Sequence, residues 1–304
     1  MRVLITGSNG FLGQKLVKRL AAESGYSLFS TSGSADRISQ DIPHDFLQVD
    51  FGDPKRLLEA IASFRPTHII HTAAISSVDV CEKDPAQCQT VNVDIVRELA
   101  TVAKKQDIHL TFLSTDFVFD GQNGPYTETD VTSACNAYGQ SKIDAEKILQ
   151  ASGCRHAILR TILVYGTPNK GSSARNLVIW AKEALSKQEN IRVVSDQWRM
   201  PTWVEDLVEA CHLAAKKQAN GIYHISGDEM FSVEEIVHEV ADYWNLDSSL
   251  ITPIMAQEIG QDKNRPRKTG FVLDKAKHEL GYTPTPFRES LKRIDEELKQ
   301  HLNN

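Results

Sequence analysis

The sequence predicts an α/β protein with a doubly wound parallel sheet and a smaller C-terminal substrate-binding lobe. Two observations support this prediction. In the first half of the 304-residue chain, short β-branched and apolar runs alternate with segments whose apolar residues recur at helical spacing. The first run also leads directly into regularly spaced glycines and then into an amphipathic segment. Such alternation is typical of a parallel sheet covered by helices on both faces.

The predicted elements follow one another at regular intervals. Strands are expected at residues 3–6, 27–31, 46–49, 68–72, 110–114 and 157–163. Helices are expected at residues 12–22, 55–64, 95–105 and 137–151. Right-handed crossovers between such strands produce the Rossmann arrangement.

The alternation stops after about residue 165. Residues 167–173 form a loop of Pro, Asn, Lys, Gly and Ser, and residues 253–269 form a polar loop. A helix and a strand are nevertheless expected at 204–215 and 222–225, where the chain returns to the main sheet. We therefore predict two domains. The NAD(P)-binding Rossmann domain covers residues 1–165, with 202–226 returning to it, and the substrate-binding lobe covers 166–201 and 227–304.

The composition and the net charge limit the classes of partner that the protein can be expected to bind. A hydrophobic content of 41 % and a charged content of 24 % are ordinary for a water-soluble protein. The net charge of −6 disfavours nucleic acid, which requires a basic face. No apolar stretch approaches the length of a membrane span, and Met1 leads directly into the first strand, which leaves no room for a secretory signal. We expect a cytoplasmic protein with no membrane partner.

The cysteines are odd in number, scattered and without a C-x-x-C pair. They are Cys81, Cys88, Cys135, Cys154 and Cys211. We expect reduced, mostly packed thiols. No metal is expected, because no His or Cys lies at ligand spacing.

Gly7, Gly10 and Gly13 follow the first strand and open a helix. A diphosphate needs backbone N–H groups at the positive end of a helix, and residues without a Cβ allow the chain to turn tightly enough to offer them. The alternative is a tight turn in a parallel sheet with no ligand. The position between strand and helix favours a dinucleotide site.

A second group of residues carries the chemistry. Tyr138 and Lys142 lie four residues apart on a predicted helix, so both side chains project from one face. A nearby cation would lower the pKa of the phenol and make it a better proton donor and acceptor. Thr115 directly follows the strand at 110–114. Its hydroxyl can there bind the oxygen on which charge develops when a ketone accepts hydride.

In this order and spacing, these residues resemble the extended short-chain dehydrogenase/reductase family, and the resemblance covers essentially the whole chain. The closest likeness is to the dTDP-4-dehydrorhamnose reductases. It is carried by the glycines at 7, 10 and 13, by the runs 113–121, 125–128 and 137–146, and by the shorter pieces 159–161, 164–166, 196–197, 201–202 and 265–266.

The resemblance implies NADPH-dependent reduction of the C4 keto group of a nucleotide-linked 4-keto-6-deoxy sugar. It implies Tyr138 as the general acid, and Lys142 as the residue that lowers the Tyr138 pKa and binds the ribose hydroxyls. Thr115 would polarise the carbonyl, while the cofactor supplies the hydride.

The substrate side is implied less specifically. Asp116 and Phe117 would line the sugar site, although Asp116 could cap the strand end and Phe117, like Phe119, could belong to the core. Arg199 stands where glycine is common in the family, and it could bind a substrate phosphate or narrow the pocket. Arg265 could bind phosphate or lie on the solvated surface.

The second strand predicts which nicotinamide cofactor is bound. It contains no acid to bind the adenine ribose 2′-hydroxyl, and Thr31, Ser32, Ser34 and Arg37 could instead hold a 2′-phosphate. We therefore favour NADP(H) over NAD(H). The expected cofactor-binding residues are Gly7, Asn9, Gly10, Phe11, Leu12, Gly13, Thr31, Ser32, Arg37, Asp50, Phe51, Ala73, Ala74, Tyr138 and Lys142. Of these, Asp50 could equally cap the helix that begins near Pro54.

Two alternative functions stay open. One is a nucleotide-sugar epimerase or dehydratase of the same superfamily, which would retain NAD. The other is a non-catalytic NADP-binding regulatory subunit, because the β subunit of methionine adenosyltransferase resembles the same reductases. The presence of Thr115, Tyr138 and Lys142 together weighs against the second. Many relatives are dimers, so a homodimer also stays open.

Overall fold

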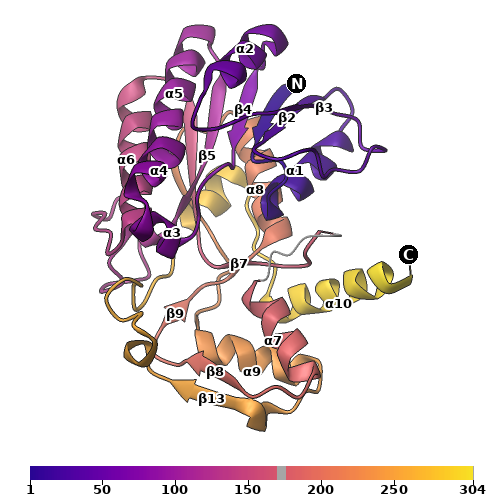
Figure 1. Ribbon diagram of the computed structural model, residues 1–304, viewed down its shortest axis with the longest axis vertical. Helices are drawn as coiled ribbons and strands as arrows, with labels where there is room; N and C mark the ends of the chain where they lie inside the picture. The colour runs from indigo at the N-terminus through magenta and orange to yellow at the C-terminus, as the bar shows by residue number, and fades with distance from the viewer. Residues whose placement is uncertain (170–175, 304) are drawn as a thin grey trace.

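One parallel sheet forms the centre of the larger part of the molecule, the upper part of Figure 1. The computed structural model describes residues 1–169 and 176–303. Within them, the sheet has seven parallel strands in the order β11-β6-β5-β4-β1-β2-β3. The strands are β1 (Arg2–Thr6), β2 (Ser27–Ser32), β3 (Asp45–Gln48), β4 (His68–His71), β5 (His109–Thr115), β6 (His156–Thr161) and β11 (Gly221–Ile225). The order reverses at β1, which confirms the predicted doubly wound fold.

Helices cover both faces of this sheet, as Figure 1 shows. They are α1 (Phe11–Ala21) and α8 (Val204–Lys216) on one face, and α2 (Lys55–Phe64), α5 (Ile95–Gln106) and α6 (Ala137–Ser152) on the other. In β1, Val3 and Ile5 belong to the first core and Leu4 to the second, because successive side chains of a strand point to opposite faces. Among the described residues, no helix has both the length and the apolar content to cross a membrane.

A smaller lobe lies below the sheet in Figure 1. Its elements include α7 (Leu177–Ser186), β8 (Ile191–Val194), β9 (Trp198–Arg199), β12 (Phe231–Ser232), α9 (Val233–Tyr243), β13 (Ile251–Ile254) and α10 (Phe287–Asn303). Strand β8 pairs with β13, and β9 with β12. Ile179, Ile236 and Leu291 contribute to a separate core here. The division into domains at the predicted boundaries stays a prediction, and the loop predicted over 167–173 lies partly outside the described residues.

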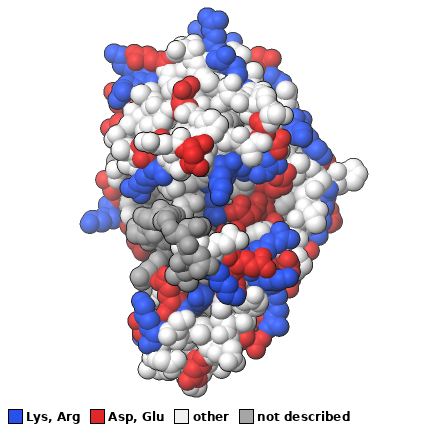
Figure 2. Space-filling model, turned by 90° about the vertical axis from the view of Figure 1, so that its right-hand side faces the viewer, with Lys and Arg blue, Asp and Glu red and all other residues white. Residues whose placement is uncertain are grey.

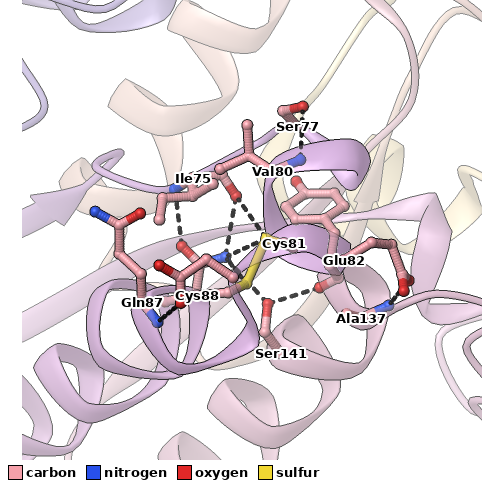
Figure 3. Close-up of a disulfide and its surroundings, with 12 residues drawn as sticks. Ile75, Ser77, Val80, Cys81, Glu82, Gln87, Cys88, Ala137 and Ser141 are labelled. Carbon is pink, nitrogen blue, oxygen red and sulfur yellow. Dashed lines mark hydrogen bonds between the residues drawn. A yellow bond between two sulfur atoms is a disulfide. The ribbon is translucent and has the colours of Figure 1, made fainter.

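The structure corrects one expectation about the cysteines. Cys81 and Cys88 form a disulfide between α3 (Val78–Lys83) and α4 (Pro85–Gln89), shown in Figure 3. The two helices meet at Asp84, which ends the first and caps the second by accepting a hydrogen bond from the Gln87 N–H. This change of direction brings the two Cα atoms within 5.2 Å, which the seven-residue separation alone could not show. The other three cysteines are free thiols.

Candidate active site

A cavity of about 950 Å³ opens at the carboxyl ends of β1, β4, β5 and β6. This is the edge at which doubly wound sheets bind ligands, and the volume lies at the upper end of the usual range for small-molecule sites. Residues of the Rossmann part and of the lobe line it together. Figure 2 shows acidic and basic side chains interspersed on the face that it draws, with no single basic surface there.

The glycine turn forms one wall of the cavity. Gly7 has φ +72°, and a Cβ there would lie 2.7 Å from the Ala73 nitrogen. A Cβ on Gly13 would collide with the Gly7 carbonyl oxygen. Gly10 is the N-cap of α1 and offers no side chain to the first turn of the helix. The turn therefore has the geometry that a diphosphate requires: close backbone approach at an uncapped helix start.

Asn9 is hydrogen-bonded to the segment that follows β2. Its Nδ2 donates to the Ser34 Oγ at 2.9 Å and to the Ala35 carbonyl at 2.7 Å. Its Oδ1 accepts from the Arg37 N–H at 3.0 Å. Asn9 thus holds the segment after β2, with the exposed Arg37, beside the glycine turn.

The remaining predicted cofactor residues have different outcomes. Thr31 is fully buried, and its hydroxyl has no hydrogen-bond partner among the described residues, so contact of this residue with a 2′-phosphate stays a prediction. Asp50 is exposed and accepts from the Gly52 N–H at 2.8 Å, whereas α2 is capped at Pro54, so Asp50 is not its cap. Ala74 lines the cavity. For Ser32, Phe51 and Ala73, cofactor contact stays a prediction.

Helix α6 brings Tyr138 and Lys142 to the opposite wall. It begins at Asn136, whose Oδ1 accepts from the Gly139 N–H at 2.7 Å. A Cβ on Gly139 would collide with the Phe117 carbonyl oxygen, so glycine allows the helix to start close to the end of β5. Phe117 packs edge-on against the Tyr138 ring, with the ring centroids 6.1 Å apart.

The Tyr138 phenol is a weaker acid here than in water. Burial raises its pKa to about 12, and a hydrogen bond with Thr115 opposes that rise. A lowering of the Tyr138 pKa by Lys142 stays a prediction. The Lys142 ammonium donates to the Leu113 carbonyl at 3.0 Å and lies 4.7 Å from the centre of the Phe112 ring.

Asp116 lies behind Thr115 in a buried polar contact. Its Oδ2 accepts from the Thr269 hydroxyl at 2.5 Å, and the Arg199 Nε lies 3.8 Å away. Burial raises the Asp116 pKa, and the Arg199 charge opposes the rise. Thr115, not Asp116, caps the short helix that follows β5, by accepting from the Phe117 N–H at 3.2 Å.

Arg199 lines the cavity and is 4 % exposed. Its guanidinium donates to the main-chain carbonyls of Trp198 and Pro266, each at 2.7 Å. It also donates to the Arg267 carbonyl at 3.2 Å. Arg199 therefore connects β9 to the segment after Arg265.

Arg265 differs from Arg199 in what its guanidinium contacts. It lines the cavity, and its buried Nε has no hydrogen-bond partner. Its guanidinium carbon lies 5.7 Å from the centre of the Phe117 ring, and one terminal nitrogen lies 3.8 Å from Asp79. Phe117 lines the cavity too, whereas Phe119 is a core residue stacked on Tyr126.

Apolar cavity residues such as Leu177 and Val233 were missed by the sequence analysis, and so were two polar ones, Ser76 and Gln261. Both lie in loops, where no periodicity or spacing marks them. Among the described residues, no group of three His, Cys, Asp or Glu side chains is placed to hold a metal ion.

Comparisons with known proteins agree with the fold. The model of the family described as the RmlD substrate binding domain matches residues 1–300. The chain is 28 % identical to the dTDP-4-dehydrorhamnose reductase of Aggregatibacter actinomycetemcomitans, over 96 % of this chain and 98 % of that protein. The predicted resemblance is thereby confirmed.

Two further relatives differ in kind. The chain is 35 % identical to methionine adenosyltransferase 2 subunit beta of Mus musculus, over 96 % of this chain and 86 % of that protein. It superposes with a TM-score of 0.83 and 26 % identity on the dTDP-4-dehydrorhamnose reductase of Bacillus anthracis in complex with NADP, covering 97 % of this chain and 99 % of that one. The chain is thus similar both to a reductase and to a subunit of another enzyme.

Proposed function

Since the chain belongs to the RmlD substrate binding domain family, we propose that it is an NADPH-dependent reductase of the C4 keto group of a nucleotide-linked 4-keto-6-deoxy sugar. One observation carries the proposal. Thr115, Tyr138 and Lys142 line a single cavity together with Gly7, Gly10 and Gly13. A proton donor, a hydroxyl for the oxyanion and a diphosphate-binding turn are the parts that such a reduction needs.

The cofactor-binding residues in this proposal are the glycine turn, Lys142 and the segment that Asn9 holds. The bound nicotinamide supplies the hydride. Arg37 provides a cation for a 2′-phosphate, and β2 has no acid that would bind a 2′-hydroxyl. The NADP in the Bacillus anthracis reductase supports the same preference.

Tyr138 delivers the proton to the carbonyl oxygen as the hydride adds to C4, so that one keto group becomes one hydroxyl. A pKa of about 12 keeps the phenol protonated at neutral pH, which is the state that reduction requires. Thr115 hydrogen-bonds to the same oxygen and stabilises the charge that develops there. Lys142 binds the ribose hydroxyls.

The substrate phosphates would meet Arg265. Its buried Nε lacks a partner, and a phosphate oxygen would satisfy it with a charge-assisted hydrogen bond. Phe117 and Asp116 line the cavity beside it, where the sugar would lie.

The direct test measures NADPH oxidation with dTDP-4-keto-6-deoxymannose generated in situ, against an NADH control. Turnover that prefers NADPH is the expected result. The Tyr138→Phe variant, prepared and assayed in the same way, should bind NADPH but should not reduce the keto sugar. Binding of NADPH without turnover of any keto sugar by the unaltered protein would contradict the proposal.

A second candidate is a regulatory subunit, favoured by the 35 % identity to methionine adenosyltransferase 2 subunit beta. It predicts that the chain co-elutes with a methionine adenosyltransferase catalytic subunit in size-exclusion chromatography and changes the kinetics of that enzyme. Co-elution without any reductase turnover would favour this function over the first. The same chromatography would show whether the chain alone is a dimer.

A further inference from the structure

The end of β5 is hydrogen-bonded to one face of α6. The Leu113 carbonyl accepts from Lys142 at 3.0 Å, and Thr115, two residues further along β5, lines the cavity together with Tyr138. Between them, the Ser114 hydroxyl donates to the Glu146 carboxylate at 2.5 Å. Glu146 stands one helical turn beyond Lys142, as Lys142 stands one turn beyond Tyr138. The mechanism proposed above uses the first two helix residues and leaves Glu146 without a role.

Glu146 is held by more than Ser114. The Arg160 guanidinium of β6 donates to its two oxygens, from Nε at 3.0 Å and from Nη2 at 2.6 Å. Both side chains are buried, with 4 % of the Glu146 and 2 % of the Arg160 side chain exposed. Arg160 also lies 5.1 Å from the centre of the Phe119 ring and 3.3 Å from the His224 Nε2. The carboxylate is therefore fixed with respect to both β5 and β6.

This pair also sets the electrostatic surroundings of Lys142. The Lys142 side chain is buried, and burial lowers its pKa to about 8, while the Glu146 charge opposes that change. Two further titratable groups bear on this environment: His71 on β4, which interacts electrostatically with Lys142, and Arg160, which is paired with Glu146. Burial lowers the His71 pKa to about 3, so that residue is neutral near pH 7 and provides no counter-charge.

We propose that Glu146 is a positioning residue: anchored by Ser114 and Arg160, it holds α6 against the end of β5 and keeps a negative charge beside the Lys142 ammonium. The effect of the Glu146 charge on the Lys142 pKa does not depend on which substrate the protein binds. The effect on turnover rests on the proposed reductase function. Removing the charge should deprotonate Lys142 at a lower pH, and releasing the anchor should misplace Tyr138 with respect to Thr115.

The test of the charge effect follows the titration of Lys142 by NMR in the full chain, labelled with ¹³C at the lysine Cε and assigned with Lys142→Met. In Glu146→Gln the midpoint should fall by about one pH unit or more. The control is Asp144→Asn, which removes a negative charge from the same helix, where Asp144 accepts only from the Gln140 amide. An unchanged midpoint in folded Glu146→Gln would overturn the proposal.

Glu146→Gln leaves Arg160 without a carboxylate, so a second variant is needed should the first not fold. Glu146→Gln/Arg160→Met removes both buried charges, a replacement that proteins often tolerate. The Lys142 midpoint should fall by less than in Glu146→Gln, because the Arg160 cation, which partly offsets the Glu146 charge, is removed as well. No fall would again contradict the proposal. The NMR titration needs no substrate, so it can succeed or fail independently of the reductase assignment.

Ser114→Ala tests the anchor separately, because it removes one hydrogen bond to Glu146 and no charge. We expect kcat to fall roughly tenfold through misplacement of Tyr138, with the Lys142 midpoint and the NADPH dissociation constant unchanged. Unchanged kcat, measured on a chain whose unaltered form does turn over, would show that Glu146 does not position the helix. No turnover by the unaltered chain would instead refute the reductase function.

Discussion

The two walls of the cavity are built in different ways. The cofactor wall comes from short, continuous stretches, above all the glycine turn of β1 and α1. The substrate wall comes from residues far apart in the chain, such as Gln197, Arg199 and Arg265. In the proposed function, a backbone conformation binds the cofactor at the first wall, and a few long side chains bind the substrate at the second. The two walls should therefore respond differently to single substitutions.

The largest effect is expected at the reacting atoms, where the walls meet. Tyr138→Phe removes the proton donor and keeps the ring against Phe117, so kcat should fall by roughly 10² to 10⁴-fold with NADPH binding retained. Steady-state kinetics and a fluorescence titration of NADPH would measure both quantities. Tyr243→Phe in α9 serves as the control. Loss of NADPH binding in Tyr138→Phe would mean that Tyr138 is structural.

NADPH binding at the cofactor wall should be lost when the backbone of the glycine turn is forced to move. In Gly7→Ala the residue must keep φ +72° with a Cβ 2.7 Å from the Ala73 nitrogen, so the turn must move. We expect NADPH affinity to fall by more than about tenfold and stability by about 1–3 kcal/mol. The control is Gly25→Ala, which also has a positive φ, of +83°, but has no atom within 4 Å of an added Cβ and does not line the cavity. Equal NADPH affinity in the two variants would contradict a role for this turn.

The substrate wall should weaken at one side chain without disturbing the cofactor. Arg265→Met keeps the apolar contact with Phe117 and removes the guanidinium, so the KM for the nucleotide sugar should rise by about tenfold with kcat and NADPH affinity little changed. Arg267→Met, on the same segment and outside the cavity, is the control. A similar KM in both variants would place the substrate phosphates elsewhere.

The difference between the walls also explains what could be predicted from the sequence. The order of the strands, the glycine turn and the shared face of Tyr138 and Lys142 depend on neighbours within a few residues. Local patterns therefore reveal them. Even so, local spacing did not show that Thr31 is enclosed, because burial depends on what packs against the strand.

Long-range contacts could not be predicted in the same way. The Arg199 guanidinium donates to carbonyl groups at 266 and 267, which lie more than sixty residues away in the sequence. Burial raises the Tyr138 pKa, and burial depends on residues that are distant in the sequence. The disulfide between Cys81 and Cys88 depends on how the chain turns at Asp84. Each outcome required the three-dimensional structure.

A smaller effect should come from the edge of the sheet opposite the cavity, and it concerns stability. His68 and His109 begin the neighbouring strands β4 and β5, with their ring centroids 5.6 Å apart. Burial, together with the charge of His109, lowers the His68 pKa to about 4. Because the pKa in the unfolded chain is about 6.5, the neutral ring favours the folded state above that pH.

Stability should accordingly be lost as the pH falls from about 6.5 towards 4, by about 1–3 kcal/mol from His68. Urea unfolding at a series of pH values would measure this slope. His68→Leu should flatten it, because the variant has no imidazole to protonate on unfolding, whereas His238→Leu on the exposed face of α9 should leave it unchanged. Cofactor affinity should be the same in both variants, since His68 lies at the far end of β4 from the cavity. An equal slope in His68→Leu and the unaltered chain would mean that acid destabilisation arises from other groups, with the buried His71 beside Lys142 the first to examine.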